Sequence, residues 1–197
     1  MSYRPMTFGA LALAAGVHGA MACGYHPGLS SATFETVHPK SLAVAVAIRQ
    51  AKDGGLLPAI PGSASLPTFA GVGYRNAVAE LRQLRDRLAH AASTAETGRD
   101  VRFALVFVQT RLWTQFAIAP GATEATIHAP PAGDGETVVL TDEAVLEAIL
   151  EERMSLEVAV ERGLVQFSND RDGAAAAVLR AALSGGPSSP AGTSTHG

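Results

Sequence analysis

The segment from Gly135 to Leu183 constrains the fold of this chain more than any other. It holds a β-type run, two short helical segments, a second β-type run and an alanine-rich helix, in that order. Thr141 is a competent N-cap, followed by Asp142 and Glu143 where the helix dipole favours negative charge. Gly163 suits the left-handed position that follows a helix. This order of strands and helices predicts an α+β domain.

The residues before this segment predict the rest of the sheet and a helix that packs on it. From Tyr74 to Ala92, apolar residues recur at helical spacing and indicate an amphipathic helix. Runs rich in β-branched and aromatic residues follow it, separated by polar or Pro-Gly turns. We therefore expect a five-stranded, mainly antiparallel sheet covered by helices. The strands are expected at 101–108, 112–119, 123–129, 136–140 and 164–167.

An N-terminal helical extension precedes this domain. Ser41 to Asp53 alternates in a way that also fits a strand, but alanine at the intervening positions favours a helix, which Gly54 and Gly55 would end. The stretch from Leu57 to Gly73 is rich in Pro, Gly and Ser and is typical of a linker or covering loop. We expect the extension and linker at 23–70, the folded domain at 71–184 and a disordered tail at 185–197.

The N-terminus is typical of an export signal. Positive charge at Arg4 precedes a short apolar run, and Ala20-Met21-Ala22 fits the small-x-small cleavage pattern. Residues 1–22 are therefore expected to be a cleaved signal peptide, which places the mature protein in the periplasm or outside the cell. Cys23, the one cysteine, would become the first residue. A lone thiol there leaves three alternatives: lipidation of Cys23, a bond to a partner, or a free thiol.

Composition and charge narrow the classes of function. The chain has 197 residues, 47% of them hydrophobic, and a formal net charge of −3. Such a charge balance disfavours nucleic-acid binding as a main role. The six histidines are scattered without metal-ligand spacing, so no cofactor and no metal are expected. No nucleophile, base and orienting residue can be matched by spacing, and an enzyme is the least favoured class.

Charged residues on the expected helices are interpreted as solvated. Arg82, Arg85 and Arg87 alternate with Glu80 and Asp86, which favours a salt-bridged face in contact with water. The pairs of acidic residues at 142–143 and 151–152 lie at expected helix ends, where neighbouring side chains point in different directions and do not form an acid/base pair.

The order of elements resembles the sterol carrier protein type 2 family. The likeness is carried by 136–146, by 155–159 with 163–167, and by 174–183. In that family a lead helix precedes a curved antiparallel sheet, two short helices, a last strand and a closing helix. The family usually has a glycine in the turn between the paired helices and a Gly-Asp or Gly-Asn pair after the last strand. This chain has 151–154 as Glu-Glu-Arg-Met and 168–170 as Ser-Asn-Asp at those places.

The resemblance implies an apolar tunnel between the sheet and its helices that takes lipids or other hydrophobic molecules. The alternative is that the same side chains simply meet and fill the core. The residues that would line the tunnel are Phe103, Leu105, Phe107, Trp113, Phe116, Ile118, Leu146, Ile149, Leu150, Phe167 and Leu179.

Two functions follow from these expectations. The first is an exported, non-enzymatic protein that binds or presents a hydrophobic small molecule or lipid, held at a membrane only if Cys23 is lipidated. The second is a periplasmic accessory subunit of an exported enzyme system, with a solidly packed domain that meets its protein partner through residues 23–70.

Overall fold

A computed structural model describes residues 38–58, 67–94 and 100–184 of the chain, and the side chains within 67–73 and at position 94 are outside the description. The expected signal peptide, Cys23 and the C-terminal tail lie outside the described residues. Within the described ranges, none of the helices combines the length and apolar character that a membrane span requires.

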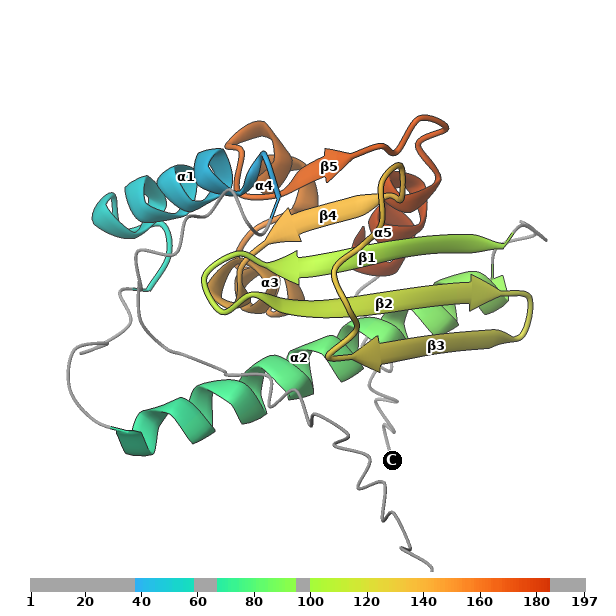
Figure 1. Cartoon of the computed structure of the whole chain (residues 1–197), viewed down its shortest axis with the longest axis horizontal. Coiled ribbons are helices and arrows are strands. Elements are labelled where there is room, and N and C mark those ends of the chain that lie inside the picture. The colour runs from blue at the N-terminus through green and yellow to red at the C-terminus, as the bar shows by residue number, and fades with distance from the viewer. Residues whose placement is uncertain (1–37, 59–66, 95–99, 185–197) are drawn as a thin grey trace, which may run out of the picture.

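One five-stranded sheet forms the centre of the molecule, in the order β3-β2-β1-β4-β5 (Figure 1). The β1–β2, β2–β3 and β4–β5 pairs are antiparallel, whereas β1 and β4 are parallel. The expected mainly antiparallel, five-stranded α+β fold is therefore confirmed. The strands are β1 (Val101–Phe107), β2 (Leu112–Ala119), β3 (Ala122–Ile127), β4 (Val138–Thr141) and β5 (Gln166–Ser168).

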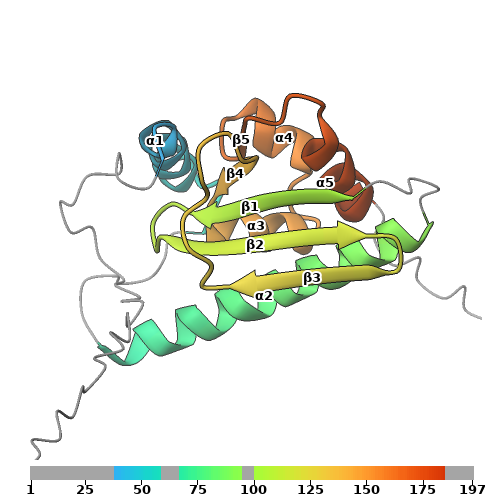
Figure 2. The ribbon, with the colours of Figure 1, turned by 45° about the vertical axis from the view of Figure 1, so that its right-hand side comes forward.

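Three helices cover one face of this sheet. The long helix α2 (Pro67–Thr94) contacts β2 and β3, and α5 (Ala174–Ser184) contacts β1 and α2. The short helix α3 (Glu143–Leu150) lies beside α2. Figures 1 and 2 show these helices on the same side of the sheet. Their apolar stripes and the strand residues that face them form a single buried cluster.

The opposite face is covered by other parts of the chain. Both ribbon views show the connection from β3 to β4 crossing it in front of β2 and β1. The backbone N–H of Ala129 in this connection donates to the carbonyl of Trp113 at 3.1 Å. Helix α1 (Ser41–Asp53) packs against β4 through its buried Val44 and Ile48.

Helix α1 lies against β5 and against the turn between α4 (Leu156–Glu161) and β5. The Lys40 ammonium donates to the carbonyl of Phe167 at 3.0 Å. A Cβ at Gly163 would lie 3.8 Å from the Cβ of Ala47. The predicted helix at 41–53 is thus confirmed to the residue, and the extension packs on the domain.

Several expected element boundaries are wrong. The strands expected at 136–140 and 164–167 lie at Val138–Thr141 and Gln166–Ser168. Helix α2 begins at Pro67, so the last residues of the expected linker are helical, and Gly71 and Gly73 lie inside the helix. Thr141 is the last residue of β4, and Asp142 is the N-cap of α3. Thr141 pairs with Phe107 of β1, so sheet pairing overrides its capping preference.

Helices α3 and α4 end in the same backbone motif although one of them lacks the usual glycine. After α4, Gly163 has a φ of 70°, its N–H donates to the carbonyl of Val160, and the next N–H donates to that of Ala159. After α3, Glu152 has a φ of 60° and makes the equivalent bond to Ile149. Both are Schellman motifs with a left-handed C′ residue.

At both places where the resembled family usually has a glycine, this chain therefore has another residue with a positive φ. Glu152 lies in the turn between α3 and α4, and Asn169, which follows β5, also has a φ of 60°. The Asn169 amide donates to the Glu136 carbonyl at 3.2 Å, which helps to hold this conformation. Left-handed backbone costs a residue with a Cβ about 1 kcal/mol or more, and asparagine less than most. The turns keep their geometry at an energetic cost that is larger at Glu152.

We expect Glu152→Gly to stabilise the folded protein by roughly 0.5–1 kcal/mol, because glycine adopts a positive φ without the Cβ penalty. Urea denaturation followed by circular dichroism measures the change. The matched control is Gly163→Ala, which places a Cβ at the equivalent position after α4 and should destabilise. A Glu152→Gly variant less stable than the parent would show that the left-handed backbone at this position is not strained.

Candidate functional site

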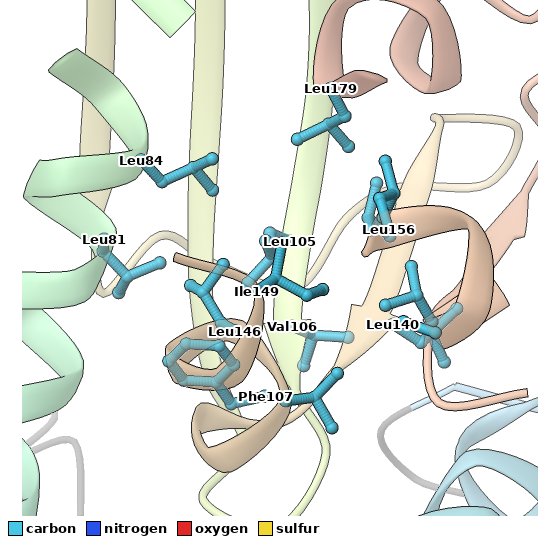
Figure 3. Packing of buried hydrophobic residues seen from close by; sticks show 14 of the residues in the cluster. Leu81, Leu84, Leu105, Val106, Phe107, Leu140, Leu146, Ile149, Leu156 and Leu179 are labelled. Atoms are coloured by element: carbon cyan, nitrogen blue, oxygen red, sulfur yellow. The ribbon is translucent and has the colours of Figure 1, made fainter. Parts of the chain in front are cut away.

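Most of the expected lining residues form one buried layer between the sheet and its helices. Figure 3 shows Leu81 and Leu84 of α2 and Leu146 of α3 gathered around Leu105 and Phe107 of β1. Ten of the eleven predicted residues are 0–7% exposed, and all ten belong to the buried cluster. The eleventh, Phe167, is partly buried and packs against the cluster.

Strand register places most of these residues on the helix-covered face. Phe103 pairs with Phe116, and their rings stack with centroids 5.1 Å apart. Because side chains alternate along a strand, Leu105, Phe107 and Ile118 share that face. The residues on α3 and α5 approach it from the helices: Leu146, Ile149, Leu150 and Leu179.

Trp113 lies on the opposite face of the sheet. It pairs with Val106, whereas its neighbour Leu112 pairs with Phe107. The backbone contact with Ala129 places it under the β3–β4 connection. Trp113 therefore does not face the layer between the sheet and its helices.

A shallow groove lies on the surface between α2 and α3. Its volume is about 190 Å³, and it is open on one side. Leu150, a predicted lining residue that is 4% exposed, forms part of its wall. Leu150 thus offers an apolar side chain within a groove whose other lining residues are mostly polar. The residues that line it are Asn76, Ala79, Glu80, Gln83, Glu147, Leu150 and Glu151.

Glu80 differs from the other lining residues of this groove in the burial and the pKa of its carboxyl group. Its Oε2 is buried and has no hydrogen-bond partner among the described residues. Burial raises the pKa of Glu80 to about 8, and the nearby carboxyls of Glu143, Glu147, Asp142 and Glu151 add to the increase. At neutral pH the Glu80 carboxyl is therefore mainly protonated, so that it can donate a hydrogen bond. The expectation that it lies on a salt-bridged, solvated face is wrong.

The start of α3 is also less solvated than expected. Asp142 is 3% exposed, and burial raises its pKa to about 6 despite the opposing effect of Lys52. The Lys52 ammonium lies 3.9 Å from the Asp142 carboxylate and joins α1 to the N-terminus of α3. Burial and the Asp142 charge raise the pKa of Glu143 to about 7. The solvated-cap interpretation holds for Glu151 and Glu152, which are exposed, but not for Asp142.

Arginines on and after these helices tie the walls of the groove together. Arg87 of α2 donates to the carbonyl of Leu150 at the end of α3, at 2.7 Å. Arg153 pairs with Glu147 and Glu151 at 3.2 and 2.7 Å. Among the expected surface pairs, Arg85 does bind Asp86 at 2.6 Å. Hydrogen bonds and ion pairs thus hold the two helices together at the C-terminal end of α3, whereas the charged groups that raise the pKa of Glu80 are carboxyls.

Within the ranges described, no three His, Cys, Asp or Glu side chains converge as metal ligands would. Glu80 offers a neutral carboxyl beside the apolar side chain of Leu150. A molecule with an apolar body could contact both.

Sequence reasoning missed the groove and its buried carboxyl. A signal existed: Asn76, Glu80 and Gln83 share one stripe of α2 with Arg87, at helical spacing. The apolar stripe of α2 predicts which side of the helix faces the sheet. It does not predict which of the polar residues on the remaining surface α3 covers. Contact between α2 and α3 depends on tertiary structure.

Comparisons with known proteins returned distant structural likenesses only. A scan against protein-family models gave no match, and a search of curated proteins gave none either. A crystal structure of Sterol Carrier Protein 2 Like 2 from Aedes aegypti is 14% identical, with a TM-score of 0.36, over 51% of this chain and 95% of that one. A solution structure from Thermus thermophilus, of a conserved hypothetical protein described as a possible sterol carrier protein, is 22% identical, with a TM-score of 0.32. It covers 58% of this chain and 90% of its own.

Another similar structure is a sec-alkylsulfatase from Pseudomonas sp., described as stereoselective and inverting. It is 18% identical, with a TM-score of 0.37, over 48% of this chain. The present chain spans 14% of the sulfatase's length. These likenesses are too distant to assign a function. From α2 to α5, the elements of this chain follow the sterol-carrier-like order: lead helix, sheet, two short helices, last strand and closing helix.

We expect the stability of the protein to fall as pH rises from about 4.5 to about 8, in part because Glu80 must give up a proton that the folded state holds more tightly than the unfolded state. The Glu80→Gln variant lacks this contribution. Its melting temperature should match that of the parent near pH 4 and exceed it by a few degrees at about pH 8.5. Differential scanning calorimetry across this range tests the expectation.

The matched control is Glu124→Gln, which removes an exposed carboxyl from β3. It should leave the difference from the parent nearly constant with pH. A Glu80→Gln variant whose advantage does not grow between these two pH values would contradict the raised pKa of Glu80.

Proposed function

We propose that this protein binds or presents a hydrophobic small molecule or lipid and carries out no reaction on it. The observation that carries the proposal is the position of Leu150, which belongs both to the buried apolar layer and to the wall of the open α2–α3 groove. A ligand that enters the groove meets the edge of this layer first. The sterol-carrier-like order of elements supports the same class of ligand.

The size of the groove defines how such a ligand would have to bind. Pockets for small ligands usually measure about 300–1,000 Å³, which exceeds the groove's volume of about 190 Å³. A longer apolar chain must therefore extend past Leu150 and displace α2 from α3. Each methylene buried contributes about 0.8 kcal/mol, so a chain of about ten carbons offers enough free energy to offset a modest separation of two helices.

We also propose that the protein is exported and that its mature N-terminus is Cys23. The signal-like sequence of residues 1–22 motivates this part of the proposal. Lipidation of Cys23 would hold the domain near a membrane, which is the natural source of a hydrophobic ligand. A free Cys23 would leave the carrier unattached.

A second function, that of an accessory subunit, is favoured by one specific observation. Leu42 and Val46 on α1 are 52% and 47% exposed, although both are large and apolar. They lie in the extension through which an exported protein partner was expected to bind. Paired exposed apolar residues of this kind suit a small protein contact.

We expect Ala79→Trp to weaken ligand uptake by roughly threefold or more. Ala79 is exposed and lines the groove, so an indole there fills the entrance without changing the buried layer. Fluorescence titration of the mature protein with an environment-sensitive apolar dye, N-phenylnaphthylamine, measures the affinity. Native mass spectrometry of protein purified from its host would identify any lipid that remains bound.

The matched control is Ala89→Trp, which adds an indole to an exposed position of α2 outside the groove lining. It should bind the dye as the parent does. A parent protein that binds no dye and carries no lipid would contradict the proposed function, and equal binding by both variants would contradict entry through the groove.

We expect intact mass measurement of the exported protein to show removal of residues 1–22. A mass increased by a diacylglycerol and an acyl chain would place Cys23 in a membrane anchor, whereas the unmodified mass would indicate a free protein. Protein that retains Met1 after expression with its own N-terminus would contradict export.

A further inference from the structure

A threonine lies in the middle of the apolar layer without a hydrogen-bond partner. Thr114 of β2 is 0% exposed, and its Oγ1 has no partner among the residues that the structure describes. Its neighbours across the sheet are Leu105 of β1 and Ile127 of β3. Along β2, Leu112 and Phe116 flank it on the same face. The four nearest strand residues on this face of the sheet are therefore apolar.

Such a hydroxyl costs the folded state free energy that a valine would not. A buried polar group without a partner is destabilising by roughly 1–3 kcal/mol, and native proteins contain few of them. Thr123 of β3, which pairs with Ile118 on the same face, also has an unpartnered Oγ1, but this residue is only partly buried. The other fully buried polar residues lie at the ends of elements. They are Ser41 at the start of α1, Thr141 and Asp142 before α3, and Ser168 at the end of β5.

We propose that Thr114 Oγ1 binds the oxygen of a hydrophobic ligand that carries one uncharged hydroxyl or carbonyl group. This inference rests on the proposed function and names the chemical class of its ligand. A threonine hydroxyl can donate to a carbonyl or exchange a hydrogen bond with an alcohol. A charged headgroup does not suit the site, because the four side chains around Thr114 are apolar and offer no compensating charge.

Helix α2 borders both the groove and the strand that holds Thr114, so a ligand would reach Thr114 only if this helix moved. Helix α2 contacts β2 and β3 and forms one wall of the groove. Figure 3 shows Leu81 and Leu84 reaching from α2 into the layer that covers these strands. Movement of α2 away from α3 would open the layer from the groove toward β2, so that the apolar body replaces leucine contacts and the oxygen meets Thr114.

The test compares an alcohol with the matching hydrocarbon. Decanol and decane are each titrated against N-phenylnaphthylamine bound to the full-length mature protein. We expect Thr114→Val to weaken decanol binding by roughly threefold to tenfold, the range of one net hydrogen bond, and to leave decane binding unchanged. Thr114→Ser keeps the hydroxyl and should retain the preference for decanol. Thr126→Val, at an exposed position of β3, is the control.

A second measurement needs no ligand. Thr114→Val should raise the melting temperature of the ligand-free protein, because valine has nearly the same shape and no unpaired hydroxyl. A lowered melting temperature would show that Thr114 already has a partner, and would overturn the inference. So would an equal effect of Thr114→Val on decanol and decane. If the parent protein binds neither compound, the proposed function itself fails. If the parent binds both compounds and Thr114→Val changes neither affinity, only the inference about Thr114 fails.

Discussion

The packing of α2, α3 and α5 against one face of the sheet is the contact on which the rest of the structure depends. Leu81, Leu84 and Leu88 of α2 are fully buried, as is Phe107 on β1. Burial of side chains of this size contributes about 1.5–3 kcal/mol each. No disulfide can form within a chain that has one cysteine, so this layer must provide most of the stability. A ligand that enters it has to replace these contacts with its own.

The sheet topology determines why the groove lies where it does. Strands β1 and β4 are parallel, so the chain must cross from β3 to β4 before it continues into α3. The crossing segment lies on the face of the sheet opposite α2. Helix α3, which follows β4, lies on the other face, beside α2. Polar side chains of both helices then meet at their shared border. The burial of Glu80 follows from this meeting, because α3 covers a stripe of α2 that would otherwise face water.

Local signals in the sequence were sufficient for much of the fold. The Ser155 hydroxyl does accept a hydrogen bond from the Val158 N–H at the start of α4, and Gly163 has its positive φ. The limits of β2 match the predicted run from Leu112 to Ala119. These features depend on neighbours within a few residues, which a sequence pattern contains directly.

The features that could not be predicted depend on contacts between distant segments. Trp113 was grouped with Phe107 because both are large and apolar, but the hairpin register places them on opposite faces. Glu152 adopts a left-handed backbone although its residue type does not favour one, since the end of α3 requires it there. The burial of Asp142 depends on α1, whose Lys52 comes from a segment about 90 residues earlier. Sequence patterns carry no direct signal for such pairings.

The central claim is that a hydrophobic molecule enters the layer between α2, α3 and the sheet. Intermolecular nuclear Overhauser effects between bound decanol and methyl groups of the labelled protein test it most directly. We expect contacts with Leu105, Leu146 and Leu150, which lie on the helix-covered side of the sheet. Contacts confined to the exposed Leu42 and Val46 of α1, or no contacts at saturating decanol, would contradict it.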